Sequence, residues 1–528
     1  MADGRSGIIQ IAGVGVGSQP VPLAEVAIHL HPDDDVAVAT RELAPRQVID
    51  GPFAALKVAR LVPVGHKVAL RAIPEGGAIH RYGQIIGFAT APIAPGDHVH
   101  SHNLGVHDFA RDYAVGVDVR PVDFVRPEAR RTFQGYLRAD GRVGTRNYVA
   151  IISTVNCSAT VTRAIADRFR HGLQERFPNV DGVIPLTHKA GCGARYGGPE
   201  VDQLQRTLAG FAHHPNIAAY VIVGLGCEIN QVQDLVTRQG LEGDAPPLFV
   251  IQDEGGLAAA VASGAAAVER LLPLADACRR TTQAAEHLVV ALQCGGSDGW
   301  SGVTANPAMG LAVDAIVRQG GTAVLGETTE VYGAEHLLTR RAASAKAAED
   351  LLERIHWWER HTALLGCEID NNPSPGNKAG GLTTIYEKSL GAIAKSGSTP
   401  LNAVYRYAER ITARGFVHMD TPGYDPVSVT GQVAGGCNVV VFTTGRGSVF
   451  GFKPAPSIKL ATNPELYRKM SDDMDINAGR VLEGATLQEV GDEIFERILA
   501  VASGEPSKSE AQGVGEEEFN PWIIGATL

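Results

Sequence analysis

The chain has 528 residues, which is too many for one hydrophobic core and predicts several domains. Hydrophobic residues make up 44% and charged residues 20%, as is typical of a globular protein and not of a disordered one. The net charge of −11, with no basic run and no interleaved aromatic residues, argues against nucleic acid as a partner.

The first residues lack the charged and apolar regions of a signal peptide, and no apolar stretch reaches the roughly 18 residues that span a bilayer. The seven cysteines are an odd number in a long chain without an export signal, which is typical of reduced thiols. We therefore expect a cytoplasmic protein that binds neither membrane nor nucleic acid.

The sequence pattern of residues 1–104 predicts a small all-β domain. Short β-type segments such as EVAIHL, DVAVAT and HKVALRAI alternate with Gly, Pro and Asp, and no amphipathic helix is evident. Between residues 105 and 131 the periodicity fades while Arg, Asp and Pro accumulate, which indicates a linker.

From residue 132 onward, apolar strands alternate with helical segments. The segments YVAIIST, DGVIPLTH, NIAAYVIVGLG and PLFVIQDEGG predict strands of a second domain over residues 132–278. A break near LLPLADACRR precedes a third domain over residues 279–520, with strands at HLVVALQCGG, TAVLGET, GFVHMDT and NVVVFTTG. This alternation predicts α/β domains with doubly wound, parallel sheets.

Cysteines recur where these strands are predicted to end, which is the edge of a parallel sheet where ligands bind. Five of the seven lie there: Cys157, Cys192, Cys227, Cys294 and Cys367. Any single one is explained as a small buried hydrophobe, but their repeated placement beside polar residues favours a functional group, whereas Cys278 lies in a helical stretch. Glu327 and Glu330 follow another strand, where they suit Fe²⁺, Mn²⁺ or Mg²⁺ or else mark the first turn of a helix.

Several loops carry further polar groups. The loop LTHKAGCGARYGG contains His188 and Lys189, and the glycine-rich CGGSDGWSG contains Ser297 and Asp298 without being a Walker or dinucleotide motif. Positive charge for an anionic substrate comes from a set of residues that are otherwise explained as surface charge: Arg142 and Arg146 with Asn147, then Lys378, Arg446, Lys453 and Lys459.

Six ordered motifs identify a known family. The segments GYLRADGRVGTRNYVAIISTVNCSATV, THKAGCG, GLGCEINQ, CGGSDGWSGVTANPA, EIDNNPSPGNKAGGLTTIYEKSLGAIAKSG and DMDINAGR resemble the altronate/galactarate dehydratase family over residues 130 to about 520. The first hundred residues resemble the β-clip (SAF-type) domain that precedes the catalytic part in these enzymes.

The resemblance implies dehydration of a sugar acid to a 2-keto-3-deoxy acid with a divalent metal, most often Fe²⁺, with Mn²⁺ as the other candidate. It also implies a three-domain homodimer whose Rossmann-like C-terminal domain holds the metal. One relative divides the β-domain and the catalytic part between two subunits of a sulfolactate lyase. A departure occurs at Asp35, where relatives often have Asn, and this change affects which acid is accepted if the position touches substrate.

Such a lyase needs a base for the proton α to a carboxylate, a Lewis acid and a proton donor for the departing hydroxyl. We expect His188 or Lys189 as the base and Arg146 or Arg446 as the carboxylate clamp. Further substrate contacts are expected from Arg142, Asn147, Ser297, Asp298 and Lys378, and metal ligands from Cys157, Cys192, Cys227, Cys294, Glu327 and Cys367. The alternatives are a lyase acting on another 2-hydroxy acid, of the sulfolactate type, and a sugar-acid-binding protein without catalysis.

The stretch GDHVHSHN places His98, His100 and His102 at alternate positions, which lie on one face of a regular strand. The simplest interpretation is a polar strand edge. The family resemblance favours another, in which His100 and His102 face the mouth of the active site and contact the substrate or the metal. His29 and His31 form a second pair with the same spacing.

Overall fold

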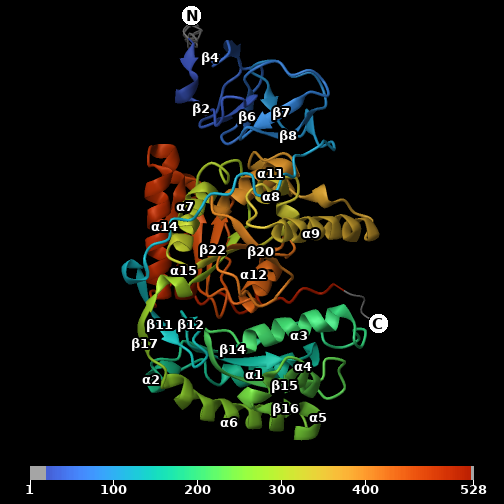
Figure 1. Cartoon of the computed structure of the whole chain (residues 1–528), viewed down its shortest axis with the longest axis vertical. Coiled ribbons are helices and arrows are strands. Elements are labelled where there is room, and N and C mark those ends of the chain that lie inside the picture. The colour runs from blue at the N-terminus through green and yellow to red at the C-terminus, as the bar shows by residue number, and fades with distance from the viewer. Residues whose placement is uncertain (1–19, 525–528) are drawn as a thin grey trace, which may run out of the picture. The chain divides into compact units, whose positions relative to one another are not determined.

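A computed structural model describes residues 20–524 of the chain (Figure 1). It divides into two compact units, one ending at His107 and one beginning at Asp108. Each unit is described by itself.

The first unit consists of short strands, as the turn-rich sequence predicts. Residues 20–107 contain one 3-10 turn (Leu23–Glu25) and no α-helix. The strands are β1 (Val21–Pro22), β2 (Ala27–Ile28), β3 (Val36–Ala39), β4 (Val48–Asp50), β5 (Ala55–Lys57), β6 (Lys67–Ala69), β7 (Ala78–Arg81), β8 (Gln84–Ala89), β9 (His98–Val99) and β10 (Leu104–Gly105). They form the sheets β1-β4-β5, β10-β8-β7 and β2-β3-β6-β9 around a small apolar core.

The segment predicted as a linker is an ordered strap on the second unit. Its backbone is hydrogen-bonded to two helices: Gly116 donates to Thr339 at 3.1 Å, and Val125 donates to Arg318 at 2.8 Å. Arg340 also pairs with Asp118 at 2.6 Å. These contacts fix a segment whose composition alone suggested freedom.

The second domain contains a four-stranded parallel sheet in the order β14-β13-β15-β16. Its strands are β13 (Tyr148–Ser153), β14 (Gly182–Leu186), β15 (Ile217–Gly224) and β16 (Leu248–Val250), and its helices are α1 (Ala159–Asp167), α2 (Leu173–Arg176), α3 (Pro199–Ala212), α4 (Val232–Arg238), α5 (Ile251–Glu254) and α6 (Leu257–Asp276). Alternate residues of the central strands face opposite layers, with Ala150 and Ile152 toward α3 and α4, and Val149 and Ile151 toward α1 and α6. A small antiparallel sheet of β12 (Val143–Gly144), β11 (Thr132–Leu137) and β17 (Arg280–Ala284) flanks it.

Helix α6 is long and apolar enough to cross a membrane by length and composition alone. Its Val261, Ala265 and Val268 are buried in the core cluster of the second domain together with α1 and the sheet. This packing accounts for its apolar composition as that of a core helix.

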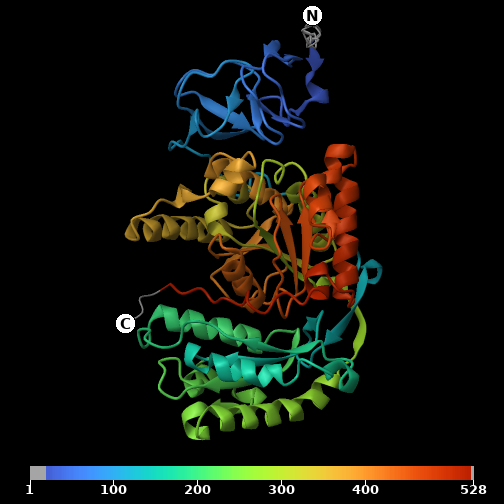
Figure 2. The ribbon, with the colours of Figure 1, turned by 180° about the vertical axis from the view of Figure 1, so that it is seen from behind.

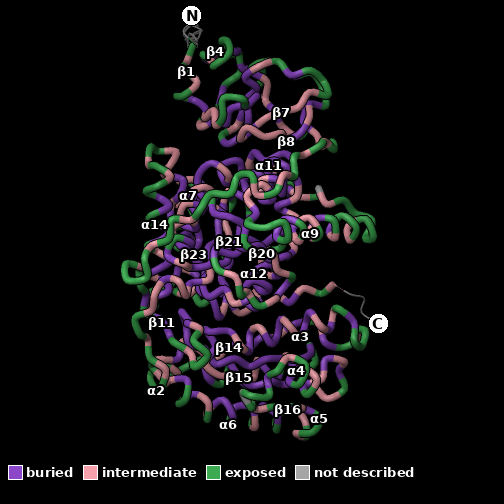
Figure 3. Tube along the Cα trace, viewed as in Figure 1, coloured by how far each residue is buried: buried purple, intermediate pink, exposed green. Residues whose placement is uncertain are grey.

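The third domain is built on a seven-stranded parallel sheet in the order β20-β21-β19-β18-β22-β23-β24. Its strands are β18 (Val289–Cys294), β19 (Thr322–Leu325), β20 (Leu401–Tyr405), β21 (Gly415–Met419), β22 (Val439–Thr444), β23 (Ser457–Ala461) and β24 (Ile476–Asn477). Its helices are α7 (Ala305–Arg318), α8 (Glu335–Thr339), α9 (Ala345–Leu364), α10 (Pro375–Ala379), α11 (Ile385–Ile393), α12 (Asp425–Ala434), α13 (Pro464–Lys469), α14 (Leu487–Ala502) and α15 (Lys508–Ala511). The central strands are buried along their length (Figure 3).

The two sheets are joined through a close helix contact. Helices α3 and α12 lie between them in both ribbon views (Figures 1 and 2). A Cβ atom on Gly210 of α3 would lie 2.3 Å from the carbonyl oxygen of Ala434 at the end of α12, so only glycine allows this approach. The second and third domains therefore form one packed body.

Candidate active site

Three potential metal ligands meet at the carboxyl edge of the third domain's sheet. The Sγ atom of Cys294 and carboxylate oxygens of Glu327 and Glu330 lie within 4.8 Å of one another, and all three residues are buried. Cys294 ends β18, and the two glutamates follow the adjacent β19. Because the chain continues from β18 to one side and later returns to β22 on the other, this is the point where strand order reverses and ligands commonly bind.

The backbone at Glu327 is unusual. Its φ of 61° lies in the left-handed region that non-glycine residues rarely adopt, and its amide donates to Thr421 Oγ1 at 2.6 Å. Its Oε1 atom is buried without a hydrogen-bond partner among residues 20–524. A strained carboxylate with a free buried oxygen is a feature of functional sites.

Two buried lysines supply positive charge. Lys388 Nζ lies 2.6 Å from Glu330 Oε1, and Lys395 Nζ lies 2.8 Å from Cys294 Sγ and 3.2 Å from Glu327 Oε2. They are seven residues apart across α11 and the turn after it, which places them on one helical face. Asn372 bridges Lys388 and Glu330, since it accepts from Lys388 at 3.0 Å and donates to Glu330 at 3.0 Å.

The titration properties of the carboxylates differ with their neighbours. Burial and the adjacent Glu330 raise the pKa of Glu327 to about 8. Burial opposes ionisation of Glu330 too, but the ammonium groups of Lys388 and Lys395 hold its pKa below the usual value. Burial raises the pKa of Asp425 to about 6 against the hydrogen bond from Gln293. The site thus holds one carboxyl group that favours its protonated form, Glu327, beside one that favours its ionised form, Glu330.

A cavity of about 320 Å³ opens at this cluster, within the range of small-molecule sites. Its walls combine the turn Gly295–Gly296 with Glu330, Lys388 and Asp425, and with Asn372, Ser374 and Tyr424. Amide, hydroxyl, ammonium and carboxylate groups therefore face one space.

The donor set fits a divalent cation. One sulfur and two carboxylates are ligands that Fe²⁺ and Mn²⁺ accept, and the free Oε1 of Glu327 has no other partner in the described chain. Burial raises the pKa of both the Cys294 thiol and Glu327, so these two groups favour their neutral forms without a cation. With both of them, Glu330 and Asp425 ionised, four negative charges would face two lysines, and a divalent cation would balance them.

Predicted residues on the CGGSDGWSG loop lie beside this cavity. Asp298 is buried and accepts hydrogen bonds from Ser301 and Thr462, both at 3.0 Å, so it holds the loop in shape. Ser297 is buried next to it, and its carbonyl accepts from Asn377 at 2.8 Å. Both residues support the glycine turn that lines the cavity.

Arg446 is placed near the same loop. Its backbone amide donates to the carbonyl of Gly296 at 2.8 Å, and its side chain is exposed. Lys378 lies on α10, the helix that also carries the buried Asn377. Arg446 is therefore a neighbour of the cavity, available for an anionic substrate.

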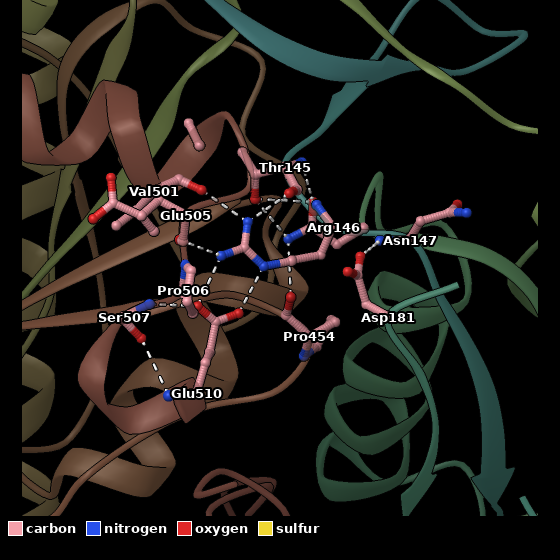
Figure 4. Close-up of polar contacts among 12 residues, drawn as sticks. Thr145, Arg146, Asn147, Asp181, Pro454, Val501, Glu505, Pro506, Ser507 and Glu510 are labelled. Atoms are coloured by element: carbon pink, nitrogen blue, oxygen red, sulfur yellow. Dashed lines mark hydrogen bonds and ion pairs between the residues drawn. The ribbon is translucent and has the colours of Figure 1, made fainter. Parts of the chain in front are cut away.

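Arg146 has a different role from the predicted clamp (Figure 4). It is 3% exposed, and its guanidinium pairs with both oxygens of Glu510 at 2.6 and 2.7 Å. Its remaining donors reach the carbonyls of Thr145, Val501 and Glu505 at 2.7, 2.8 and 3.1 Å. All five N–H groups are used, so Arg146 joins the second and third domains and has no donor left for substrate.

Asn147 and Arg142 also lie away from the cluster. The amide of Asn147 donates to the carbonyls of Asn179 and Ala275 at 2.7 and 2.9 Å, inside the second domain. Arg142 pairs with Asp140 at 2.5 Å and lines a separate cavity of about 430 Å³ at the amino ends of β18 and β19, opposite the edge that carries Cys294. Neither residue lines the cavity at Cys294, and their substrate contacts stay predictions.

His188 does not suit the predicted role of base. Its Nε2 is 2.9 Å from the carbonyl of Ser153, and its Nδ1 accepts from the amide of Ala190 at 3.2 Å, so both nitrogens are committed. Burial lowers its pKa to about 4. The neighbouring Lys189 is exposed in the same loop of the second domain, and neither residue belongs to the cluster at Cys294.

The predicted cysteines separate into three places. Only Cys294 belongs to the carboxylate cluster. Cys157, Cys192 and Cys227 are exposed on loops of the other sheet, in the second domain. Cys367 is also exposed, but it follows helix α9 where a strand was expected.

Four histidines of the first unit lie close together, and one of them, His66, is buried. The strand β9 ends at Val99, so His100 and His102 lie in the turn after it. The rings still group: His98 lies 5.4 Å from His100 and 5.5 Å from His102 between centroids, and His66 joins them. Their expected contact with substrate or metal stays a prediction.

Sequence reasoning missed four residues of the cluster: Asn372, Lys388, Lys395 and Asp425. A signal existed for the lysines, since two lysines seven residues apart lie in a helical stretch rich in apolar residues. Asp425 gave none, because it becomes significant only when α12 places it beside β18.

Fold and site together define a multidomain enzyme with a polar cavity at the switch point of a parallel sheet. Family models match in the expected order: the SAF domain of altronate/galactarate dehydratase over residues 25–107, the second domain of D-galactarate dehydratase/altronate hydrolase over 135–276, and the D-galactarate/altronate dehydratase C-terminal domain over 285–527.

Relatives with known names match most of the length of this chain. Galactarate dehydratase (L-threo-forming) of Escherichia coli is 39% identical over 94% of this chain and 96% of its own length. Altronate dehydratases of Escherichia coli and Bacillus subtilis are 35% and 32% identical, covering 92% and 90% of this chain and 96% and 95% of their own lengths. The chain belongs to the altronate/galactarate dehydratase family.

Proposed function

We propose that this protein is a hydro-lyase that removes water from a sugar acid, an aldarate or aldonate such as galactarate or altronate, to give a 2-keto-3-deoxy acid. The observation that carries the proposal is the buried cluster of Cys294, Glu327, Glu330 and Lys388 beside a polar cavity. Family membership supports the reaction class, and the higher identity to galactarate dehydratase favours an aldarate.

Asp425 is the general base in this account. It lines the cavity, Gln293 orients it at 2.9 Å, and its pKa of about 6 leaves it ionised near neutral pH yet basic enough to accept a proton. It removes the proton α to the substrate carboxylate, and the electron pair then expels the β-hydroxyl group as an enol forms. The enol becomes the 2-keto acid by taking up a proton at carbon 3 while its hydroxyl group loses one.

Lys388 stabilises the charge that this step creates. Its ammonium faces the cavity and donates to Glu330 and Asn372, which leaves one N–H for a substrate oxygen. That N–H can either hold the developing enediolate or protonate the departing hydroxyl. Asn372 and Ser374 offer hydrogen bonds to the other hydroxyl groups.

Cys294, Glu327 and Glu330 would hold a divalent cation, Fe²⁺ or Mn²⁺, which supplies a Lewis acid when bound. The free oxygen of Glu327 and the charge balance support this assignment. We further propose a Rossmann-like third domain, a β-clip first domain, a homodimer and a cytoplasmic location.

A library of sugar acids tests the proposal. Anaerobically prepared protein supplied with Fe²⁺ or Mn²⁺ is incubated with galactarate, altronate and their epimers, and 2-keto acid is measured. Turnover of at least one acid, lost on chelation and restored by metal, is expected. Binding of these acids without turnover would replace the proposal by a sugar-acid-binding protein.

A sulfolactate lyase is the second candidate. The β subunit of (2R)-sulfolactate sulfo-lyase of Chromohalobacter salexigens is 34% identical over 74% of this chain and 96% of its own length. Sulfolactate therefore belongs in the library, with sulfite release as its readout. The first unit is fused here, and galactarate dehydratase, which matches 94% of this chain, is the nearer model.

A further inference from the structure

Three cysteines of the second domain remain outside the proposed active site. Cys157, Cys192 and Cys227 follow β13, β14 and β15, and all three are exposed. Cysteine is among the residue types most often buried, so three exposed thiols at one sheet edge need an explanation. The strands are neighbours in the order β14-β13-β15, about 4.8 Å apart, so their carboxyl-end loops lie side by side.

Hydrogen bonds tie the three cysteine loops together. The amide of Asn156, next to Cys157, donates to the carbonyl of Ala190 at 3.0 Å. In the loop that carries Cys227, Asn230 donates through its amide to Gly191 at 3.1 Å and through its side chain to Thr154 at 2.8 Å. The loops are thus mutually positioned and do not vary independently.

The close approach of these loops depends on glycine. Gly191 has a φ of +98°, and a Cβ atom there would lie 2.3 Å from the carbonyl oxygen of Thr154. Gly226, directly before Cys227, has a φ of +127°. Glycine thus allows the positive φ angles that the backbone adopts directly before Cys192 and Cys227 at this edge.

A hydrogen-bond donor and two positive charges near these cysteines favour a ligand with sulfur and negative charge. Gln252 Nε2 donates to Cys227 Sγ at 3.6 Å, as amides do around thiolates in metal clusters. Lys189 and Arg195, both exposed, carry positive charge on the loop of Cys192.

The spacing excludes a ready-made site for one metal ion. Sulfurs around one tetrahedral zinc lie about 3.8 Å apart. Among the described residues, the one group of three His, Cys, Asp or Glu ligand atoms within 4.8 Å is that of Cys294. The three thiols lie on adjacent loops but do not all fall within 4.8 Å of one another, as suits a polynuclear cluster, whose iron atoms separate the ligands.

We propose that Cys157, Cys192 and Cys227 bind a [4Fe–4S] cluster, each thiolate holding one iron and the fourth iron facing solvent without a protein ligand. Binding releases one proton from each thiol. The site is separate from the cluster at Cys294 and does not depend on the proposed function, because cluster content is measured without substrate.

The test is anaerobic reconstitution of the full chain with equal amounts of Fe²⁺ and Fe³⁺ and matching sulfide. We expect four iron and four acid-labile sulfide per chain, broad visible absorption from sulfide-to-iron charge transfer, and a spin-½ signal after one-electron reduction. Cys157→Ala, Cys192→Ala and Cys227→Ala should each lose most of the cluster. Because the three side chains are exposed, their melting temperatures without iron should match that of the parent chain.

The controls are Cys367→Ala, which removes an exposed thiol elsewhere, and Cys294→Ala, which removes the thiol of the other site. Both should keep the full cluster. Iron and sulfide that fail to bind, that bind equally to the three alanine variants, or that are lost only with Cys294→Ala would overturn the proposal. Zinc bound at one per chain through the three thiols, with no labile sulfide, would overturn it as well.

Discussion

The two parallel sheets of this chain bear reactive side chains at the same kind of edge but in different surroundings. In the third domain Cys294 is buried, and carboxylates and lysines from three other segments converge on it. In the second domain Cys157, Cys192 and Cys227 are exposed, and their loops contact mainly one another. Strand-end placement thus marks both edges, while the converging segments decide what chemistry each edge supports.

The contrast extends to charge. Around Cys294, buried lysines and glutamates form pairs at 2.6 and 3.2 Å, which fixes an electrostatic field inside a cavity. The second domain instead uses its charged and polar side chains for cohesion, as Arg146 and His188 do. Substitutions in the two regions should therefore affect different properties.

The largest expected effect is at Lys388. Lys388→Met removes the ammonium that faces the cavity, so kcat should fall by about 10³-fold or more while substrate binding changes less. Steady-state kinetics on the best substrate measure this. Lys346→Met is the control, because Lys346 is exposed and pairs only with Asp350 in the described structure, and it should keep parental kcat. Wild-type turnover in Lys388→Met would remove this lysine from the mechanism.

Arg446 should matter less, and through binding. Arg446→Lys exchanges a two-pronged donor for a point charge beside the glycine turn, so KM should rise roughly 10-fold with kcat little changed. Arg468→Lys, on an exposed arginine of the same domain, is the matched control. An unchanged KM would place the carboxylate clamp elsewhere.

Substitution of Arg146 should lower stability without changing catalysis. Arg146→Met leaves Glu510 without its partner, so the free energy of unfolding should fall by about 3 kcal/mol. Turnover per folded molecule should be unchanged, because no donor of Arg146 faces the cavity. Urea unfolding measures the free energy of unfolding. Kinetics normalised to the concentration of active sites measure the turnover per folded molecule. A folded variant with low kcat would return Arg146 to the active site.

A smaller effect concerns pH. Burial lowers the pKa of His188 to about 4 and of His214 to about 3, whereas an unfolded histidine titrates near 6.5. The unfolded chain thus binds protons first as pH falls, so stability is complete above about 6.5 and declines toward pH 4. Urea unfolding between pH 7.5 and 4.5 measures the slope. His188→Gln should reduce the slope, whereas His171→Gln, at an exposed position, should leave it unchanged.

Regular patterns predicted the fold better than the site. Apolar runs separated by helical segments were sufficient for two parallel sheets, and dense turn residues for a β-rich first domain. The strap over residues 108–131 was not predictable as ordered, because its contacts with Thr339 and Arg318 are made by backbone atoms that any sequence offers.

The candidate site residues also differ in how far a local sequence pattern could predict them. Cys294 and Glu327 lie at the ends of apolar strands, and this local signal led to their prediction as ligands, which stays a prediction. Arg146 and His188 gave a similar signal, but their donors are consumed by partners distant in sequence, such as Glu510 and Ser153, which no local pattern reveals. Asp425 becomes significant only through packing of α12 on β18.

The central claim is that catalysis occurs at the carboxyl edge of the third domain's sheet. The most direct measurement is the anomalous difference density of crystals soaked with Mn²⁺ and the best sugar acid, using Lys388→Met to slow turnover. The account predicts a manganese peak contacting Cys294, Glu327 and Glu330, with substrate in the adjoining cavity beside Asp425. Substrate bound at another site, with this cavity and its three ligands empty, would contradict it.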